Sequence, residues 1–147
     1  MSEIKATLVP KEHVLTIWPQ VERFMDMAAE YTYGRYDTDD ILTAITDYDH
    51  HLWVAFEVGG PLLGAVVTSF RYYPKKKYLD LTFLGGDNGF SWKDPMLKVL
   101  QHWAYDNECD GIESSGRPGW SKVFKEDGYK MLWQTYELPV ATSGLGD

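Results

Sequence analysis

A glycine-rich stretch at residues 84–92 is the first part of this sequence that could carry chemistry. It reads Leu-Gly-Gly-Asp-Asn-Gly-Phe-Ser-Trp, follows a strand-like run and precedes a helix-like run. A helix that begins just after such a turn presents free backbone N–H groups, and these bind phosphate and other anions. The other interpretation is a plain strand-to-helix loop, in which the glycines only permit positive φ angles. The sequence leaves both interpretations open.

A second candidate stretch, residues 114–131, places a short amphipathic segment between two glycine turns. The pattern predicts a short helix at 120–126, with Gly128 as the left-handed residue that ends it. Arg117, in the turn before this helix, could bind a phosphate or a carboxylate. A salt bridge from Arg117 to one of the many carboxylates is an equally simple interpretation.

Histidine and cysteine give weaker indications of chemistry. His50 and His51 lie near Asp47 and Asp49, but the spacing is irregular and neighbouring strand residues point to opposite faces. We therefore expect no zinc site. Cys109 is the only cysteine, which excludes an internal disulfide, and nothing in the sequence brings a histidine to it. A small buried thiol is the expectation.

The composition indicates one soluble domain. The 147 residues are 44% hydrophobic and 15% aromatic, which supplies enough apolar side chains for one well-filled core. The formal net charge of −8 and the pI of about 4.9 disfavour nucleic acid as a partner. The sequence shows no secretory signal and no apolar run of about 20 residues, so we expect no membrane span and a cytoplasmic location. The small polar tail at 141–147 is expected to be flexible.

Hydrophobic periodicity predicts elements in the order β, α, α, β, β, β, α, β, α, β. Pro19 lies inside the first helical pattern, which predicts a kink or two short helices there. Gly59-Gly60 predicts a hairpin between the second and third strands. The expected strands are residues 4–9, 52–58, 62–72, 78–84, 111–115 and 130–138, and the expected helices are residues 11–30, a helix starting at 38–40, 95–108 and 120–126.

These elements and motifs resemble the GNAT superfamily of acyl-CoA-dependent N-acyltransferases. The likeness rests on the strand order, the glycine turn after the third long strand, and the ending Trp-Ser-Lys-Val-Phe-Lys-Glu-Asp-Gly-Tyr at 120–129. Phe-Leu-Gly-Gly at 83–86 and Gly-Arg-Pro-Gly-Trp at 116–120 further resemble GNAT-like proteins that tailed bacteriophages encode. The likeness covers about residues 4–138.

The resemblance implies an α/β (α+β) fold with a mixed, mostly antiparallel central sheet. This sheet would have about six to seven strands, flanked by helices and splayed between strands 4 and 5, in a single domain at residues 1–140. In the family, the pantetheine arm of acetyl-CoA lies in that opening, and the pyrophosphate lies on the turn and helix start that follow. The cofactor-binding residues carried over to this sequence are Thr82, Phe83, Leu84, Gly85, Gly86, Gly89 and Ser91, with Arg117 as a further anion-binding candidate.

The sequence departs from the family pattern at two places. Gly86 stands where the family has Arg or Gln, and Asp87 and Asp94 add negative charge near the expected pyrophosphate, unless they are helix caps. Phe124 stands where many members carry the tyrosine that protonates the leaving thiolate. Tyr129 takes a position that usually packs in the core.

The resemblance also implies a base that takes a proton from the acceptor amine. Asp80 and Glu113, on the predicted fourth and fifth strands, are the candidates. The alternative is that both are solvated residues on a polar face. Strand alternation predicts one face with Tyr78, Asp80 and Thr82, and an opposite face with Leu79, Leu81 and Phe83.

The function implied by the resemblance is transfer of an acetyl group from acetyl-CoA to an amine of a small molecule or a protein, without a metal. The alternative is a catalytically degenerate GNAT-fold protein of a tailed phage, acting as a virion-associated or host-interacting module. A phage or host protein is then the expected partner, and the host cytoplasm or the virion the expected location. Self-association fits either function. Trp or Phe side chains filling the opening would favour the alternative.

Overall fold

The computed structural model describes residues 3–87, 91–115, 126 and 128–140. The chain forms two compact units, residues 1–115 and residues 116–147, and each is described by itself. Almost all of the regular secondary structure described below belongs to the first unit.

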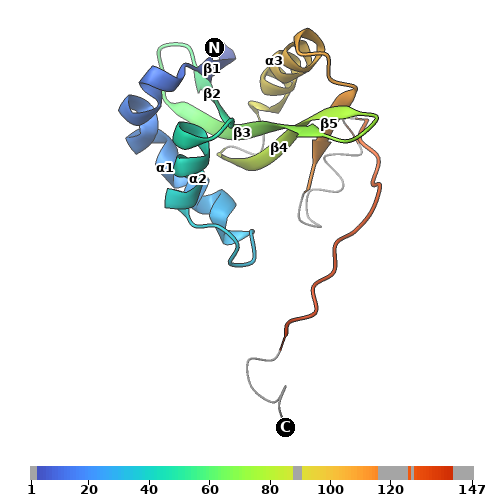
Figure 1. The fold of residues 1–147 in the computed structure, drawn as a ribbon. Coiled ribbons are helices and arrows are strands. Elements are labelled where there is room, and N and C mark those ends of the chain that lie inside the picture. The colour runs from blue at the N-terminus through green and yellow to red at the C-terminus, as the bar shows by residue number, and fades with distance from the viewer. Residues whose placement is uncertain (1–2, 88–90, 116–125, 127, 141–147) are drawn as a thin grey trace. The chain divides into compact units, whose positions relative to one another are not determined.

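A single five-stranded sheet organises the first unit (Figure 1). The strands follow one another in space in the order of the chain, and each neighbouring pair is antiparallel except the last, β4 with β5, which is parallel. The expectation of six to seven strands is therefore wrong for the described residues. The strands are β1 (Ile4–Val9), β2 (His51–Glu57), β3 (Leu62–Tyr72), β4 (Lys77–Gly86) and β5 (Gly111–Ser114).

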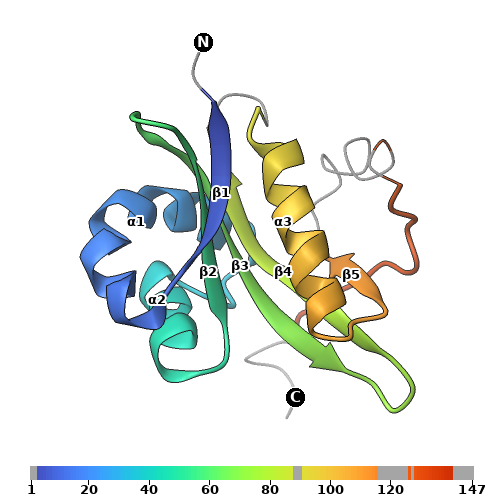
Figure 2. The ribbon, with the colours of Figure 1, turned by 90° about the horizontal axis from the view of Figure 1, so that it is seen from above.

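Helices cover both faces of this sheet (Figure 2). A short 3₁₀ turn, η1 (Lys11–His13), leads into α1 (Val14–Glu30), and α1 packs with α2 (Thr38–Asp47) on one face. The other face is covered by α3 (Lys93–Asp106), which connects β4 to the parallel strand β5. Pro19 lies inside α1, which continues through it as one helix.

The apolar spacing of α1 explains its position on the sheet. Its buried residues recur every three or four positions, which gives one apolar stripe along the helix. This stripe packs against inward-facing residues of β2, β3 and β4. Asp37 caps the neighbouring helix α2, since its carboxylate accepts from the backbone N–H of Asp40 and the Asp40 carboxylate accepts from the N–H of Asp37.

A second core lies between α3 and the opposite face of the sheet. Met96, Leu100 and Ala104 of α3 pack against Leu79 and other residues of the strands. Trp92, just before α3, is buried in the same core. Its ring fills the space over β3 and β4 where two residues lack side chains, Gly64 and Gly86.

The second unit contradicts one prediction. Residues 130–138 form no strand, although the sequence pattern predicts one. A strand needs a neighbour to satisfy its backbone groups, and the large apolar side chains of this segment are exposed rather than packed. Gly128 has φ +89°, the left-handed conformation that the sequence predicts. The predicted helix at 120–126 lies outside the described residues except for its last position.

Among the described residues, no helix combines the length and the apolar character required to span a bilayer.

Candidate active site

A β-bulge in β4 sets which side chains reach each face of the sheet. Leu81 pairs with Thr68 and Phe83 pairs with Val67, so Thr82 is an extra residue on β4. The bulge reverses the alternation after Thr82, and Phe83 enters the core under α1 and α2. The prediction that Phe83 shares a face with Leu79 and Leu81 is therefore wrong, whereas those two leucines do pack together under α3.

A row of polar residues crosses the sheet next to this bulge, on the face that carries α1 and α2. Ser69 of β3 pairs with Asp80 of β4, and Asp80 pairs with Glu113 of β5. Paired residues of neighbouring strands share a face, so the structure brings the two predicted base candidates side by side. We call Ser69, Asp80 and Glu113 the polar row.

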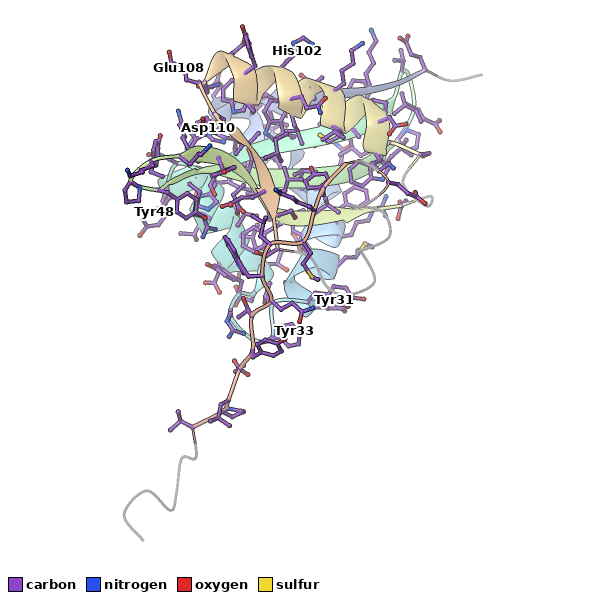
Figure 3. The ribbon with its side chains drawn as sticks, turned by 90° about the vertical axis from the view of Figure 1, so that its right-hand side faces the viewer. Tyr31, Tyr33, Tyr48, His102, Glu108 and Asp110 are labelled. Carbon is purple, nitrogen blue, oxygen red and sulfur yellow. The ribbon has the colours of Figure 1, made fainter. Side chains whose placement is uncertain are left out.

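The register of the parallel pair is fixed at the start of β5. The backbone N–H of Lys77 donates to the Asp110 carboxylate at 2.9 Å, and the N–H of Asp110 donates to the Lys77 carbonyl at 2.7 Å. Figure 3 shows Asp110 where the chain returns from α3 toward the sheet. These two bonds anchor β5 against β4 and thereby place Glu113 beside Asp80.

Asp80 is buried, with only 4% of its surface exposed, and one of its carboxylate oxygens has two partners. Oδ2 accepts from the Thr82 hydroxyl at 2.8 Å and from the Arg71 guanidinium at 3.3 Å. Because Thr82 gives its proton to Asp80, the 2.9 Å bond between Thr82 and Ser69 has Ser69 as its donor. The expectation of a solvated polar-face residue therefore does not describe Asp80.

Glu113 is more accessible but also has partners. The Tyr73 hydroxyl donates to Oε1 at 2.8 Å, and Nε of Arg71 lies 3.8 Å from the same oxygen. The hydrogen bond to Glu113 raises the pKa of the Tyr73 phenol above its usual value of about 10. Arg71 thus lies between both carboxylates, and sequence reasoning missed it because only the strand register brings it there.

His50 lies next to this row and was considered in the sequence only as a metal ligand. It directly precedes β2, and its ring Nδ1 is buried without a hydrogen-bond partner. Burial lowers the pKa of its imidazole, while the Asp80 carboxylate opposes that shift and Lys11 adds to it. The electrostatic influence of Asp80 is consistent with a place near the polar row.

Beyond the polar row, β4 continues further than β5. The last pair between the two strands joins Leu81 to Ser114, and β4 runs on for Thr82–Gly86. Among the described residues, this part of β4 has no β5 partner, so its backbone edge fits the amide groups of an extended pantetheine arm. Phe83 and Leu84 pack their side chains into the two cores, so they could line such an arm only through backbone.

The turn after β4 uses its glycines for packing. A Cβ on Gly85 would overlap the carbonyl of Phe24 in α1, and a Cβ on Gly86 would overlap the ring of Trp92. Neither glycine has a positive φ, so the expectation of glycines that only permit such angles is wrong for these two. Gly85 and Gly86 instead allow α1 and Trp92 to approach the strand closely.

Asp87 completes this turn with both of its polar groups engaged. Its backbone N–H donates to the Leu63 carbonyl at 2.7 Å, and its carboxylate lies 2.7 Å from the Arg23 guanidinium. That N–H is therefore unavailable to a phosphate, and the carboxylate charge is paired. The described part of the turn fits a pyrophosphate less well than the free edge of β4 fits pantetheine.

The remaining predicted cofactor residues lie at or beyond the described boundary. Ser91 is exposed just before α3. In the first turn of α3, Lys93 and Asp94 have backbone N–H groups but Pro95 has none. Gly89, Arg117 and Phe124 lie outside the described residues.

Metal and thiol chemistry find little support in the described part of the chain. No group of three or more His, Cys, Asp or Glu side chains there could hold a metal ion. Cys109 is half-buried against the core under α3, and burial raises the pKa of its thiol.

Comparisons with sequences identify no relative: no family model matches the chain, and no curated protein matches it at the threshold applied.

Solved structures, by contrast, match nearly the whole chain. A ribosomal-protein-alanine N-acetyltransferase from Brucella melitensis has a TM-score of 0.69 and 14% identity, covering 95% of this chain and 100% of its own. An aminoglycoside acetyltransferase from an uncultured soil metagenomic sample has a TM-score of 0.66 and 9% identity, covering 94% of this chain and 97% of its own. An integron cassette protein from Vibrio cholerae has a TM-score of 0.63 and 16% identity, covering 99% of this chain and 96% of its own. At these identities the likeness establishes architecture, and the chain has the GNAT-like fold of known acetyltransferase structures.

Proposed function

We propose that this protein transfers an acetyl group from acetyl-CoA to an amine. The observation that carries the proposal is that β4 extends beyond the end of β5, directly next to the polar row. The pantetheine arm of acetyl-CoA contains amide groups, which pair with a free strand edge as a further strand would. An acetyl group held at that edge lies toward Asp80 and Glu113.

The charges around the polar row suit a cationic acceptor. Asp80 and Glu113 carry two negative charges and Arg71 carries one positive charge, so the cluster has a net charge of −1. A primary amine in its ammonium form is attracted to such a site, and the attraction is stronger at a partly buried position than in water. An acceptor with a carboxylate beside its amine is disfavoured by the same charges. Small-molecule amines and lysine or N-terminal amines of proteins both remain acceptors within this proposal.

The polar row also offers groups that could take part in proton removal. An amine must lose a proton before its lone pair can attack the acetyl carbonyl, and a positioned base contributes to that step. Asp80 and Glu113 are the bases that the sequence predicts, and they lie on the same face as the bulge at Thr82. When bound, acetyl-CoA would supply the activated acetyl group.

A second candidate function follows from the turn after β4. Gly86 is packed against Trp92, the N–H of Asp87 is bonded to Leu63, and the Asp87 carboxylate adds negative charge where a pyrophosphate would lie. These features favour a GNAT-fold protein without transfer activity, for which binding of a phage or host protein is the alternative role. The two candidates differ in whether acetyl-CoA binds.

Calorimetric titration with acetyl-CoA and with CoA at low salt separates them. Under the transferase proposal we expect a dissociation constant in the micromolar range, on the order of −8 kcal/mol. No binding at millimolar acetyl-CoA would overturn the transferase and leave the binding module. Added salt is expected to weaken the affinity for acetyl-CoA, because it screens the attraction between the cofactor's phosphates and cationic side chains. Those side chains must come from outside the turn after β4.

Transfer is then measured against a panel of primary amines by the release of the CoA thiol. Asp80→Asn and Glu113→Gln each remove a negative charge that attracts the ammonium, and each is expected to lower kcat/KM by about 10-fold or more. Asp106→Asn is the matched control, because Asp106 is an exposed carboxylate at the end of α3 on the opposite side of the sheet. Equal activity in all three variants would remove the polar row from the mechanism.

A further inference from the structure

His50 extends the polar row by one strand. His51 of β2 pairs with Thr68 of β3, so continuing this antiparallel register places His50 opposite Ser69. His51 belongs to the face under α3, where its ring lies edge-on to Phe70 and Trp103. Because neighbouring residues of an extended chain point to opposite faces, His50 lies on the face of Ser69, Asp80 and Glu113.

The two neighbouring histidines differ in their hydrogen bonds. Thr68 accepts a bond from the indole N–H of Trp53 at 3.0 Å, and its hydroxyl lies 3.1 Å from Nδ1 of His51. Nδ1 of His51 is therefore engaged within the core, whichever of the two atoms donates. In His50, by contrast, Nδ1 is buried and has no partner. Buried polar atoms in folded proteins almost always have partners, so an exception is a candidate for a group that meets a ligand.

The charged groups around His50 come from four parts of the chain. Asp80 on β4 and Asp49 before β2 favour the protonated ring, while Lys11 on η1 and Arg71 on β3 oppose it. Burial is the largest influence, and it lowers the pKa of the imidazole below its usual 6.5. The ring is therefore neutral at pH 7, with a lone pair available to accept a proton.

The carboxylates of the row are less suited to that task. Asp80 already binds Arg71 and Thr82, and Glu113 already accepts from Tyr73. An imidazole, with an ordinary pKa of about 6.5, is in general a stronger base than a carboxylate. A neutral imidazole beside a buried carboxylate can take a proton, because the carboxylate stabilises the cation that forms.

A small cavity lies beside this histidine. Its volume is about 90 Å³, and most of its lining is apolar, with Lys11 and the two histidines as its polar residues. The Lys11 ammonium at its rim is held by the carbonyls of Ile45 at 3.0 Å and Tyr48 at 2.7 Å. The cavity thus leaves open space next to the His50 ring.

We propose that His50 is the proton acceptor for the acceptor amine and that Asp80 stabilises the resulting imidazolium. The inference rests on the proposed acetyl transfer and deepens it. An N–H bond of the ammonium breaks, its proton moves to a ring nitrogen of His50, and the electron pair stays on the amine nitrogen. That pair forms the C–N bond to the acetyl carbonyl while the C–S bond breaks and its electrons leave with sulfur. The second amine proton ends on the thiolate sulfur, and the imidazolium returns its proton to water.

The test compares His50→Gln with His102→Gln across a pH series of kcat/KM, using an amine that the wild-type protein acetylates. His102 is an exposed histidine on α3 (Figure 3), the helix that covers the opposite face of the sheet from the polar row, and it serves as the control. We expect His50→Gln to lower kcat/KM at pH 7 by about 100-fold. We also expect the acidic limb of the wild-type profile, with a midpoint below 6.5, to disappear in that variant. His102→Gln should keep both the rate and the limb.

A second measurement does not depend on activity. Nuclear magnetic resonance titration of the imidazole protons should give His50 a pKa below 6.5 in the wild-type protein, and a still lower one in Asp80→Asn. The proposal is overturned if the pKa of His50 in the wild-type protein is 6.5 or higher. It is also overturned if Asp80→Asn leaves that pKa unchanged. This holds even if His50→Gln fails to fold.

The outcomes separate the two levels of the argument. If the wild-type protein binds acetyl-CoA and acetylates an amine, while His50→Gln keeps its rate within about threefold and its acidic limb, the role of His50 is wrong and the transferase stands. A lowered rate with an unchanged limb indicates a structural role and also overturns the proposal. If the wild-type protein neither binds acetyl-CoA nor acetylates any amine, the proposed function fails, and the role of His50 fails with it.

Discussion

Arg71 and Asp80 form an ion pair across β3 and β4 in which the carboxylate is buried and the guanidinium is half exposed. The side chain of Arg71 is 53% exposed, while that of Asp80 is 6% exposed. A carboxylate removed from water in this way depends on its remaining partners for stability. The pair therefore contributes to folding as well as to the charge of the polar row.

Removing Arg71 should destabilise the protein modestly. Arg71→Gln leaves the buried Asp80 carboxylate with Thr82 as its main partner, and we expect a loss of about 1 kcal/mol in the free energy of unfolding, because exposure of the guanidinium screens the pair. Urea denaturation of Arg71→Gln, Asp80→Asn and the double variant measures the coupling. We expect the double variant to lose less than the sum of the single losses. Strict additivity would show that the pair contributes nothing.

Replacing Gly85 should destabilise the protein more than replacing a glycine that has a positive φ but open space around it. Gly85→Ala places a Cβ against the Phe24 carbonyl, so the backbone of α1 has to move, and overpacking of this kind costs about 1–3 kcal/mol. Gly34→Ala is the control, since Gly34 has φ +77° but open space around it. Its cost is expected to stay near about 1 kcal/mol. Thermal and urea unfolding compare the two, and an equal or smaller effect at Gly85 would contradict the packing argument.

Stability should fall as the pH drops below neutrality, because His50 and His51 both have lowered pKa values in the folded protein. Burial is the main cause in each case. The unfolded chain then binds more protons than the folded one between the lowered values and the usual 6.5. The stability is therefore fully present above 6.5 and is lost as the pH falls through that window.

Urea denaturation from about pH 7.5 to about pH 5.5 tests this dependence. The double variant His50→Gln, His51→Gln should show a smaller slope of unfolding free energy against pH than the wild-type protein. His102→Gln should keep the wild-type slope, since His102 is exposed. An unchanged slope in the double variant would assign the dependence to other groups.

The thiol of Cys109 should react slowly. Burial raises its pKa, Asp110 acts in the same direction, and Lys77 opposes them. Only the thiolate is nucleophilic, so its exchange with an added disulfide at neutral pH should be roughly tenfold slower in the folded protein than in urea. Thiol titration with a chromogenic disulfide measures both rates. Equal rates would contradict the half-buried position of this residue.

The sequence predicted the fold of the first unit well, because its signals are local. The apolar spacing of α1 and the turns on either side of β3 determine those elements without tertiary information. Strand ends agreed within a few residues for the same reason. Residues 130–138 show the limit, since a segment of apolar and aromatic residues indicates a strand only if a neighbouring strand is present.

The candidate site was only partly visible in the sequence. Asp80 and Glu113 were identified as candidates, but the roles of Arg71 and His50 depend on the register between strands that are far apart in the chain. The bulge at Thr82 could not be foreseen, because strict alternation is the default for an extended strand. Glycine at positions 85 and 86 is compatible both with a phosphate-binding turn and with close packing against α1 and Trp92, so the sequence could not distinguish the two.

The packing of Trp92 against Gly64 and Gly86 also constrains how this protein could evolve. An arginine or glutamine at position 86, which the GNAT resemblance leads one to expect, would collide with the indole ring. Such a change is tolerable only if Trp92 has first become smaller, and a smaller residue there opens a hole in the core under α3. The three positions are thus coupled, and each single step between the two arrangements passes through a destabilised protein. The core packing around Trp92 thus favours glycine at position 86 independently of any ligand that the turn binds.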